Sequence, residues 1–89
     1  MCGSCWAFAS TAVMESSHAI NTNELIPLSE QNLVSCSFGD KNLGCSGGWY
    51  YWAWDYAAAH PLMTEKDYPY SSAAGADGEC FYDQKMGKV

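Results

Sequence analysis

Cys2-Gly3-Ser4-Cys5-Trp6-Ala7-Phe8 is the stretch of this 89-residue sequence that carries the most information about its fold. It places a second thiol directly before a run of residues that predicts a helix. A cysteine at a helix N-terminus lies beside backbone N–H groups without intrahelical partners and beside the positive end of the helix dipole. This environment favours the thiolate, which is the reactive form of cysteine. Cys5 is therefore the candidate nucleophile.

Further blocks along the chain agree with this opening stretch. They are Leu28-Ser29-Glu30-Gln31-Asn32-Leu33-Val34-Ser35-Cys36, then Gly44-Cys45-Ser46-Gly47-Gly48, then Asp67-Tyr68-Pro69-Tyr70, followed by Cys80. In this order they resemble the papain-like cysteine proteases, with the cathepsin L-like branch nearest, and the opening stretch matches the C-G-[SA]-C-[WY] pattern around the nucleophile of that family. The resemblance implies a mainly α chain: the left, helical lobe of the papain-like α+β two-lobe fold, stapled by disulfides.

The same resemblance implies the roles of individual residues. Cys5 would be the catalytic nucleophile, and its backbone N–H would form one half of the oxyanion hole. The glycine pair and the residues after it would line the substrate cleft, where glycine lets an extended peptide approach and pair with the backbone. By position these substrate-binding residues are Gly47, Gly48, Trp49 and Tyr50. Trp49 would flank the third subsite and Tyr50 would form part of the wall of the second. Trp6 would pack under the loop that holds the nucleophile.

The resemblance also covers the cysteines and the extent of the domain. The cysteines would pair as Cys2–Cys45 and Cys36–Cys80, which leaves Cys5 free. The family's partner His and Asn lie roughly 130–150 residues after the nucleophile. We therefore expect residues 1–89 to be a partial peptidase domain without the right lobe that carries them, and without the oxyanion-hole Gln upstream. The parent would be a cysteine-type endopeptidase working through an acyl-enzyme, and the 89 residues alone would be inactive.

Neither histidine of the sequence is a candidate base. His18 follows Cys5 by 13 residues. On one helix that spacing corresponds to roughly 19 Å at a rise of about 1.5 Å per residue, whereas a general base must come within about 3 Å. His60 directly precedes Pro61 and is predicted to end another helix.

Composition and charge exclude several partners. The net charge is −6, with four lysines and no arginine. No basic patch can therefore be assembled for a nucleic acid or an anionic membrane, and the sequence holds no transmembrane stretch. No metal or organic cofactor is implied. The implied partners are a peptide or protein substrate, the right lobe of the same parent, a pro-segment and cystatin-like inhibitors. Five cysteines in so short a chain indicate disulfides and an oxidising compartment, lysosomal or secreted.

Two other functional classes stay open at the level of sequence. A non-catalytic peptide-binding or inhibitory half-domain would keep the bridges and the groove while lacking catalysis. A C-x-x-C dithiol oxidoreductase would use Cys2 and Cys5 as a reversible pair, although it needs a preceding strand that the sequence does not show.

The pattern of helix formers and turn residues predicts three helices. The first runs from Cys5 to about Ile20 and is closed by 21–23. The second is capped by Ser29 and ends at Cys36. A polar loop over 37–44 precedes a third helix, opened by Gly47-Gly48 and running to about His60. The chain after Pro61 is predicted to be irregular. Glu30, in the first turn of the second helix, is open to two interpretations: a buried structural carboxylate, as in the resembled family, or an exposed helix-start glutamate.

Overall fold

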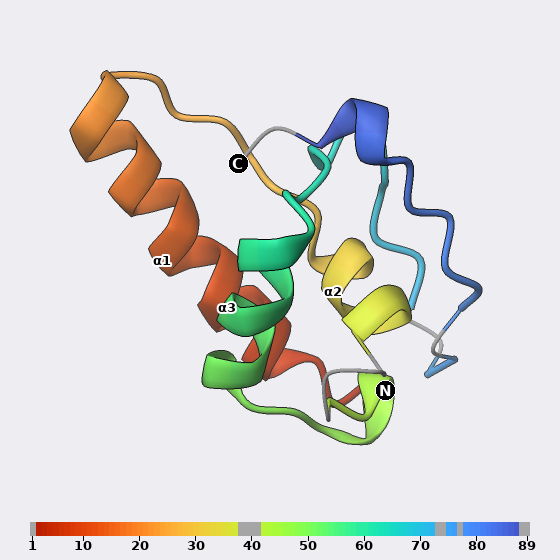
Figure 1. Cartoon of the computed structure of the whole chain (residues 1–89). Coiled ribbons are helices and arrows are strands. Elements are labelled where there is room, and N and C mark those ends of the chain that lie inside the picture. Colours follow the sequence, from red (N-terminus) through yellow and green to blue (C-terminus); the bar gives the residue numbers. More distant parts are fainter. Residues whose placement is uncertain (1, 38–41, 73–74, 77, 88–89) are drawn as a thin grey trace.

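Helices connected by irregular segments make up this fold. The computed structural model describes residues 2–37, 42–72, 75–76 and 78–87. The elements in chain order are α1 (Cys5–Thr22), α2 (Glu30–Cys36), the short 3-10 turn η2 (Gly44–Ser46), α3 (Tyr50–Ala59) and the 3-10 turn η3 (Gln84–Met86). The long helix α1 packs against both α2 and α3, and the irregular C-terminal segment runs on the far side of α2 from α1 (Figure 1). Within the described ranges the only extended pairing is an isolated bridge between Leu28 and Thr64. The mainly helical fold class is confirmed, whereas part of the predicted loop, 38–41, lies outside the described residues.

The first helix ends as its turn residues predict. Asn23 follows α1 in the left-handed conformation, with φ 61°, and its N–H donates to Ala19 O at 2.8 Å. Asparagine is one of the few non-glycine residues that adopt this conformation readily. The helix extends slightly past the predicted end at Ile20, to Thr22, whose hydroxyl donates to His18 O at 2.7 Å within the last turn.

The cap of the second helix is also confirmed. Ser29 is extended, with φ −85° and ψ 110°, and its hydroxyl accepts the N–H of Asn32 at 2.9 Å. The same hydroxyl donates to Tyr68 O at 2.6 Å. One serine therefore caps α2 and attaches the segment around Tyr68 to it, which explains why this fully buried polar side chain is tolerated in the core.

The third helix begins later than the sequence predicts. Gly47-Gly48 does not open it: α3 starts at Tyr50, and Trp49 before it is extended, with φ −137° and ψ 140°. Gly47 has a φ of 123°, which is far from helical backbone and favours glycine. The predicted end is confirmed, because His60 leaves helical backbone and its N–H donates to Tyr56 O at 2.8 Å.

The core lies where α1, α2 and α3 meet. Its apolar members are Trp6, Ala7, Leu28, Leu33, Val34, Ala53, Tyr56 and Leu62. Buried amides accompany them. Asn32 Oδ1 accepts the N–H of Met63 at 3.0 Å, and Gln31 bridges Ser71 N at 2.8 Å to the hydroxyl of Ser72 at 2.8 Å. These hydrogen bonds attach the irregular segment after α3 to α2. Side chains of a short helix therefore hold this segment, as the backbone hydrogen bonds of a sheet would hold a strand.

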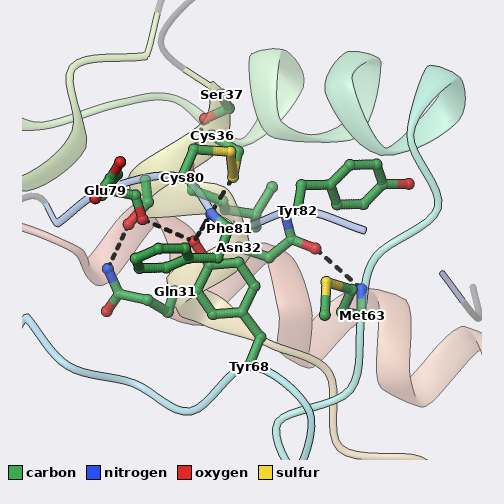
Figure 2. Close-up of a disulfide and its surroundings, with 12 residues drawn as sticks. Gln31, Asn32, Cys36, Ser37, Met63, Tyr68, Glu79, Cys80, Phe81 and Tyr82 are labelled. Carbon is green, nitrogen blue, oxygen red and sulfur yellow. Dashed lines mark hydrogen bonds between the residues drawn. A yellow bond between two sulfur atoms is a disulfide. The ribbon is translucent and has the colours of Figure 1, made fainter. Parts of the chain in front are cut away.

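Two disulfides staple the chain, between the pairs that the resemblance implies: Cys2–Cys45 and Cys36–Cys80. Figure 2 shows the second one, with the hydroxyl of Tyr68 directed toward the main chain beside it. That hydroxyl donates to Glu79 O at 3.1 Å and accepts the N–H of Phe81 at 2.9 Å. The chain on both sides of Cys80 is therefore held by a side chain as well as by the bridge.

None of the helices in the described part of the chain has the length and apolar character needed to cross a membrane.

Candidate active site

Cys5 occupies the first position of α1. It is exposed, and it is the one cysteine of the five that forms no disulfide. The first N–H groups of a helix have no intrahelical acceptor, so they surround this thiol with partial positive charge. No acidic residue stands in the first turn to oppose that field. The structure thus places the candidate nucleophile where an anion is stabilised.

The turn before Cys5 is fastened to the chain around Cys45. The Cys2–Cys45 disulfide joins them, and the N–H of Gly3 donates to Cys45 O at 2.8 Å. A Cβ on Gly3 would lie 2.8 Å from that same carbonyl oxygen. Glycine is required here because two stretches of backbone approach each other closely. The nucleophile and the Gly47-Gly48 pair are thereby held together, although they are far apart in the sequence.

Trp6 packs beneath this junction, at the position expected for it. Its indole Nε1 donates to Gly44 O at 3.1 Å, and the side chain is buried. A Cβ on Gly48 would lie 2.7 Å from Trp6 Cδ2 and 2.6 Å from Asn42 Oδ1. Gly48 therefore has a packing reason to be glycine, in addition to any contact with a substrate.

Asn42 is a site residue that sequence reasoning missed. It is fully buried; its Oδ1 accepts the N–H of Trp49 at 2.8 Å, and its Nδ2 donates to the hydroxyl of Ser37 at 3.3 Å. This side chain fixes the extended backbone that carries the predicted substrate-binding residues. The only sequence signal was its place in a polar loop, and such a position is usually exposed.

The predicted substrate-binding residues form one surface beside this loop. Trp49 is 48% exposed, and its ring lies 4.8 Å from that of Tyr50. An open hollow of about 430 Å³ is lined by Leu43, Ser46, Gly47, Gly48, Trp49 and Trp52. A hydrogen bond with Tyr51 raises the pKa of Tyr50 above its usual value, so Tyr50 stays neutral at physiological pH. The described residues that line this surface are therefore uncharged, and most of them are aromatic or glycine.

A further contact reaches the residue before the nucleophile. The hydroxyls of Ser4 and Tyr70 lie 3.0 Å apart, and the ring of Tyr70 stands edge-on to that of Phe8 at 5.1 Å between centroids. The sequence singled out the Tyr-Pro-Tyr segment without giving Tyr70 a role. No local pattern would have revealed one, because the two hydroxyls come from segments 66 residues apart.

The two histidines lie at other places in the fold. His18 is in the last part of α1, where its Nε2 is 3.9 Å from Glu24 Oε1. His60 caps α3 and stacks on Tyr56 with ring centroids 4.6 Å apart. Neither is in the first turn of α1 with Cys5. Among the described residues no group of three or more His, Cys, Asp or Glu side chains is arranged to hold a metal ion.

Glu30 combines the two interpretations that the sequence left open. It begins α2, is partly buried, and its Oε2 accepts the hydroxyl of Thr11 at 2.8 Å. Burial raises the pKa of the Glu30 carboxyl; the bond from Thr11 opposes this, and the neighbouring Glu65 raises the pKa further through a hydrogen bond and its negative charge. Glu65 Oε1 is itself buried without a donor.

A sequence model described as papain family cysteine protease matches residues 1–89. The chain is 45% identical over 86 residues to a protein named cathepsin L-like from Caenorhabditis elegans, covering 96% of this chain and 25% of that protein. It is 46% identical over 76 residues to cysteine proteinase 2 from Dictyostelium discoideum, covering 84% of this chain and 20% of that protein.

Among solved structures, the chain is similar to digestive procathepsin L 3 of the Tenebrio molitor larval midgut. The TM-score is 0.89 and the sequence identity is 38%, covering 97% of this chain and 27% of that chain. The chain thus spans about a quarter of the length of the relatives that it matches.

Proposed function

The chain belongs to the papain family of cysteine proteases, and we propose that the full-length protein is a cysteine-type endopeptidase with Cys5 as its nucleophile. One observation carries the proposal. Cys5 is the free, exposed thiol at the N-terminus of α1, and a disulfide joins the turn before it to the loop that leads into Gly47-Gly48. A reactive thiol and a surface for an extended peptide are therefore part of one rigid junction.

The chemistry proposed for Cys5 is acyl transfer. The thiolate attacks the carbonyl carbon of the scissile bond, a C–S bond forms, and the oxygen takes up the negative charge. The backbone N–H of Cys5 is one donor to that oxyanion. Collapse of the intermediate expels the amine, which takes a proton from a general acid. Water then hydrolyses the acyl-enzyme. The base and acid would come from the portion of the family's length that this chain does not span.

The substrate class proposed is an extended peptide held beside the glycine pair. Gly47 and Gly48 present their backbone, to which a peptide can pair like an added strand. Trp49 and Tyr50 supply apolar walls, and the open hollow next to them accepts a side chain. Because this surface carries no charge, we expect preference to depend on apolar side chains of the substrate rather than on charged ones.

The outer face of α1 supports a further partner, the remaining lobe of the same protein. Val13 and Ile20 on this helix are 53% and 81% exposed, and they line an open hollow of about 450 Å³. Such apolar exposure marks an interaction surface. A pro-segment and cystatin-like inhibitors are proposed as partners of the cleft. The two disulfides support a lysosomal or secreted location.

The experiment is turnover of a fluorogenic peptide amide by the full-length protein, its Cys5→Ala variant and the 89-residue chain. We expect activity in the first and none in the other two, since the chain offers no histidine at the thiol. Turnover that survives Cys5→Ala would overturn the role of Cys5, and turnover by the 89 residues would overturn the need for a second lobe. No turnover with retained peptide binding by Cys5→Ser would favour the binding half-domain instead.

A further inference from the structure

The serine before the nucleophile is an N-cap residue whose side chain does not cap. Ser4 stands at the N-cap position of α1, yet its hydroxyl accepts no N–H from the first turn of the helix. Its backbone, with φ −104° and ψ 13°, also departs from the extended conformation of a capping residue. Ser29, at the same position of α2, is extended and does cap its helix. The chain thus contains both arrangements, and the uncapped one belongs to the helix that carries Cys5.

The hydroxyl of Ser4 is directed to Tyr70 instead. The two hydroxyl oxygens are 3.0 Å apart, and Ser4 is buried while Tyr70 is half-buried. Tyr70 is itself held in place: its N–H donates to Glu65 Oε2 at 3.0 Å, and its ring stands edge-on to Phe8. Tyr70 therefore reaches the start of α1 from a segment fixed elsewhere in the fold, independently of the loop around Cys45.

The contact between Ser4 and Tyr70 affects which N–H groups at the start of α1 have a hydrogen-bond acceptor. The carbonyl of Ser4 already accepts the N–H of Ala7 at 2.9 Å and that of Phe8 at 3.2 Å. A capping serine accepts from the second or third residue of its helix, so a hydroxyl released from Tyr70 would turn to the N–H of Trp6 once the backbone of Ser4 moves to the extended conformation of a cap. That N–H belongs to the group of donors that favour negative charge at Cys5. Capping by Ser4 would satisfy it and weaken the field at the thiol.

We propose that Tyr70 is a positioning residue for Cys5: its hydroxyl holds the hydroxyl of Ser4 out of the helix cap and so leaves the first turn of α1 to an anion at Cys5. The inference rests on the proposed role of Cys5, but it concerns the reactivity of the thiol and does not depend on peptidase activity. Within the part of the chain that the structure describes, the segment 42–48 contributes only the disulfide-bonded Cys45, the first turn of α1 contributes no acidic residue, and Glu65 Oε2 accepts the N–H of Tyr70.

The test is alkylation of the 89-residue chain by iodoacetamide across a range of pH. Cys5 is the one free cysteine, so the reaction reports this thiol alone. Tyr70→Phe removes the hydroxyl and keeps the ring beside Phe8. We expect the rate of Tyr70→Phe near neutral pH to fall about two- to five-fold and its pH–rate profile to move to higher pH, which corresponds to the usual strength of a charge at a helix N-terminus.

Two further variants separate positioning from support of the structure. Ser4→Ala loses the same hydrogen bond but has no hydroxyl that could cap the helix, so it should alkylate at the wild-type rate. Ser4→Ala combined with Tyr70→Phe should return to that rate as well. A wild-type rate for Tyr70→Phe would overturn the proposal. So would an equal loss in Ser4→Ala, or a double variant as slow as Tyr70→Phe, because either result would mean that the contact matters only for stability. None of these outcomes depends on whether the full-length protein cleaves peptides.

Discussion

The indole of Trp6 occupies the space into which a side chain at Gly48 would project. A Cβ at Gly48 would lie 2.7 Å from two atoms of that ring. The residue after the nucleophile and the second glycine of the pair are thus in direct contact, although 42 residues separate them in the chain. The start of α1 and the proposed substrate-binding surface are therefore mechanically one unit.

Gly48→Ala is expected to destabilise the fold and to displace Trp6. The added methyl meets an aromatic ring and Asn42 Oδ1, both of which are buried, and overpacking of this kind costs about 1–3 kcal/mol. Urea unfolding of the disulfide-bonded chain measures the loss. Ser46→Ala, an exposed change in the same loop, should stay within about 0.5 kcal/mol. Equal stability of the two variants would contradict the contact.

Asn42→Ala is expected to free the extended segment that contains Trp49. The substitution leaves the N–H of Trp49 without its acceptor, which costs about 1–3 kcal/mol when the group is buried. Hydrogen exchange at the Trp49 amide should accelerate together with the loss of stability. Asn21→Ala serves as the matched control, since the amide of Asn21 bonds to Ser17 O on an exposed helix surface. An unchanged Trp49 exchange rate would show that Asn42 does not hold this segment.

Tyr68→Phe is expected to loosen the chain around the Cys36–Cys80 bridge. The hydroxyl of Tyr68 bonds to Glu79 O and to the N–H of Phe81 (Figure 2), so its removal leaves both groups unpaired. We expect a loss of about 1–3 kcal/mol and faster exchange of the Phe81 amide. Tyr82→Phe removes a hydroxyl that bonds to Pro61 O at an exposed position, and it should cost much less. Similar losses for the two tyrosines would argue against a special role for Tyr68.

Glu30→Gln is expected to change how stability depends on pH. The pKa of Glu30 is raised in the folded state, mainly by burial, so the folded chain binds this proton more tightly than the unfolded chain does. The contribution of Glu30 to stability is therefore complete below its unfolded pKa of about 4.3 and is lost as pH rises through the folded value. Glutamine is neutral throughout. The stability of Glu30→Gln relative to wild type should increase as pH rises from about 4 to about 7.

Thermal unfolding at several pH values checks this expectation. Glu79→Gln is the matched control, because Glu79 is exposed and contacts Tyr68 only through its main chain. A stability difference between Glu30→Gln and wild type that stays constant with pH would contradict a raised pKa of Glu30 in the folded chain.

Local sequence was sufficient for the ends of the helices. Ser29 caps α2 because a serine hydroxyl two or three residues before an N–H can reach it without help from the rest of the chain. Asn23 and His60 end α1 and α3 for equally local reasons, namely left-handed backbone and a following proline. The local sequence predicted the start of α3 wrongly, because the N–H of Trp49 bonds to Asn42, a residue outside the helix.

By itself the sequence determined the family, the candidate nucleophile at the start of α1, and the helical character of the chain. Each of these inferences depends on short stretches of residues that are neighbours along the chain. The tertiary structure alone decided how the site is supported: Gly48 against Trp6, Asn42 under Trp49, and Tyr70 on the hydroxyl of Ser4. These contacts join residues that only folding brings together. Hydrogen bonds and close packing act over a few ångströms in space, whereas sequence patterns report only the order of neighbours along the chain.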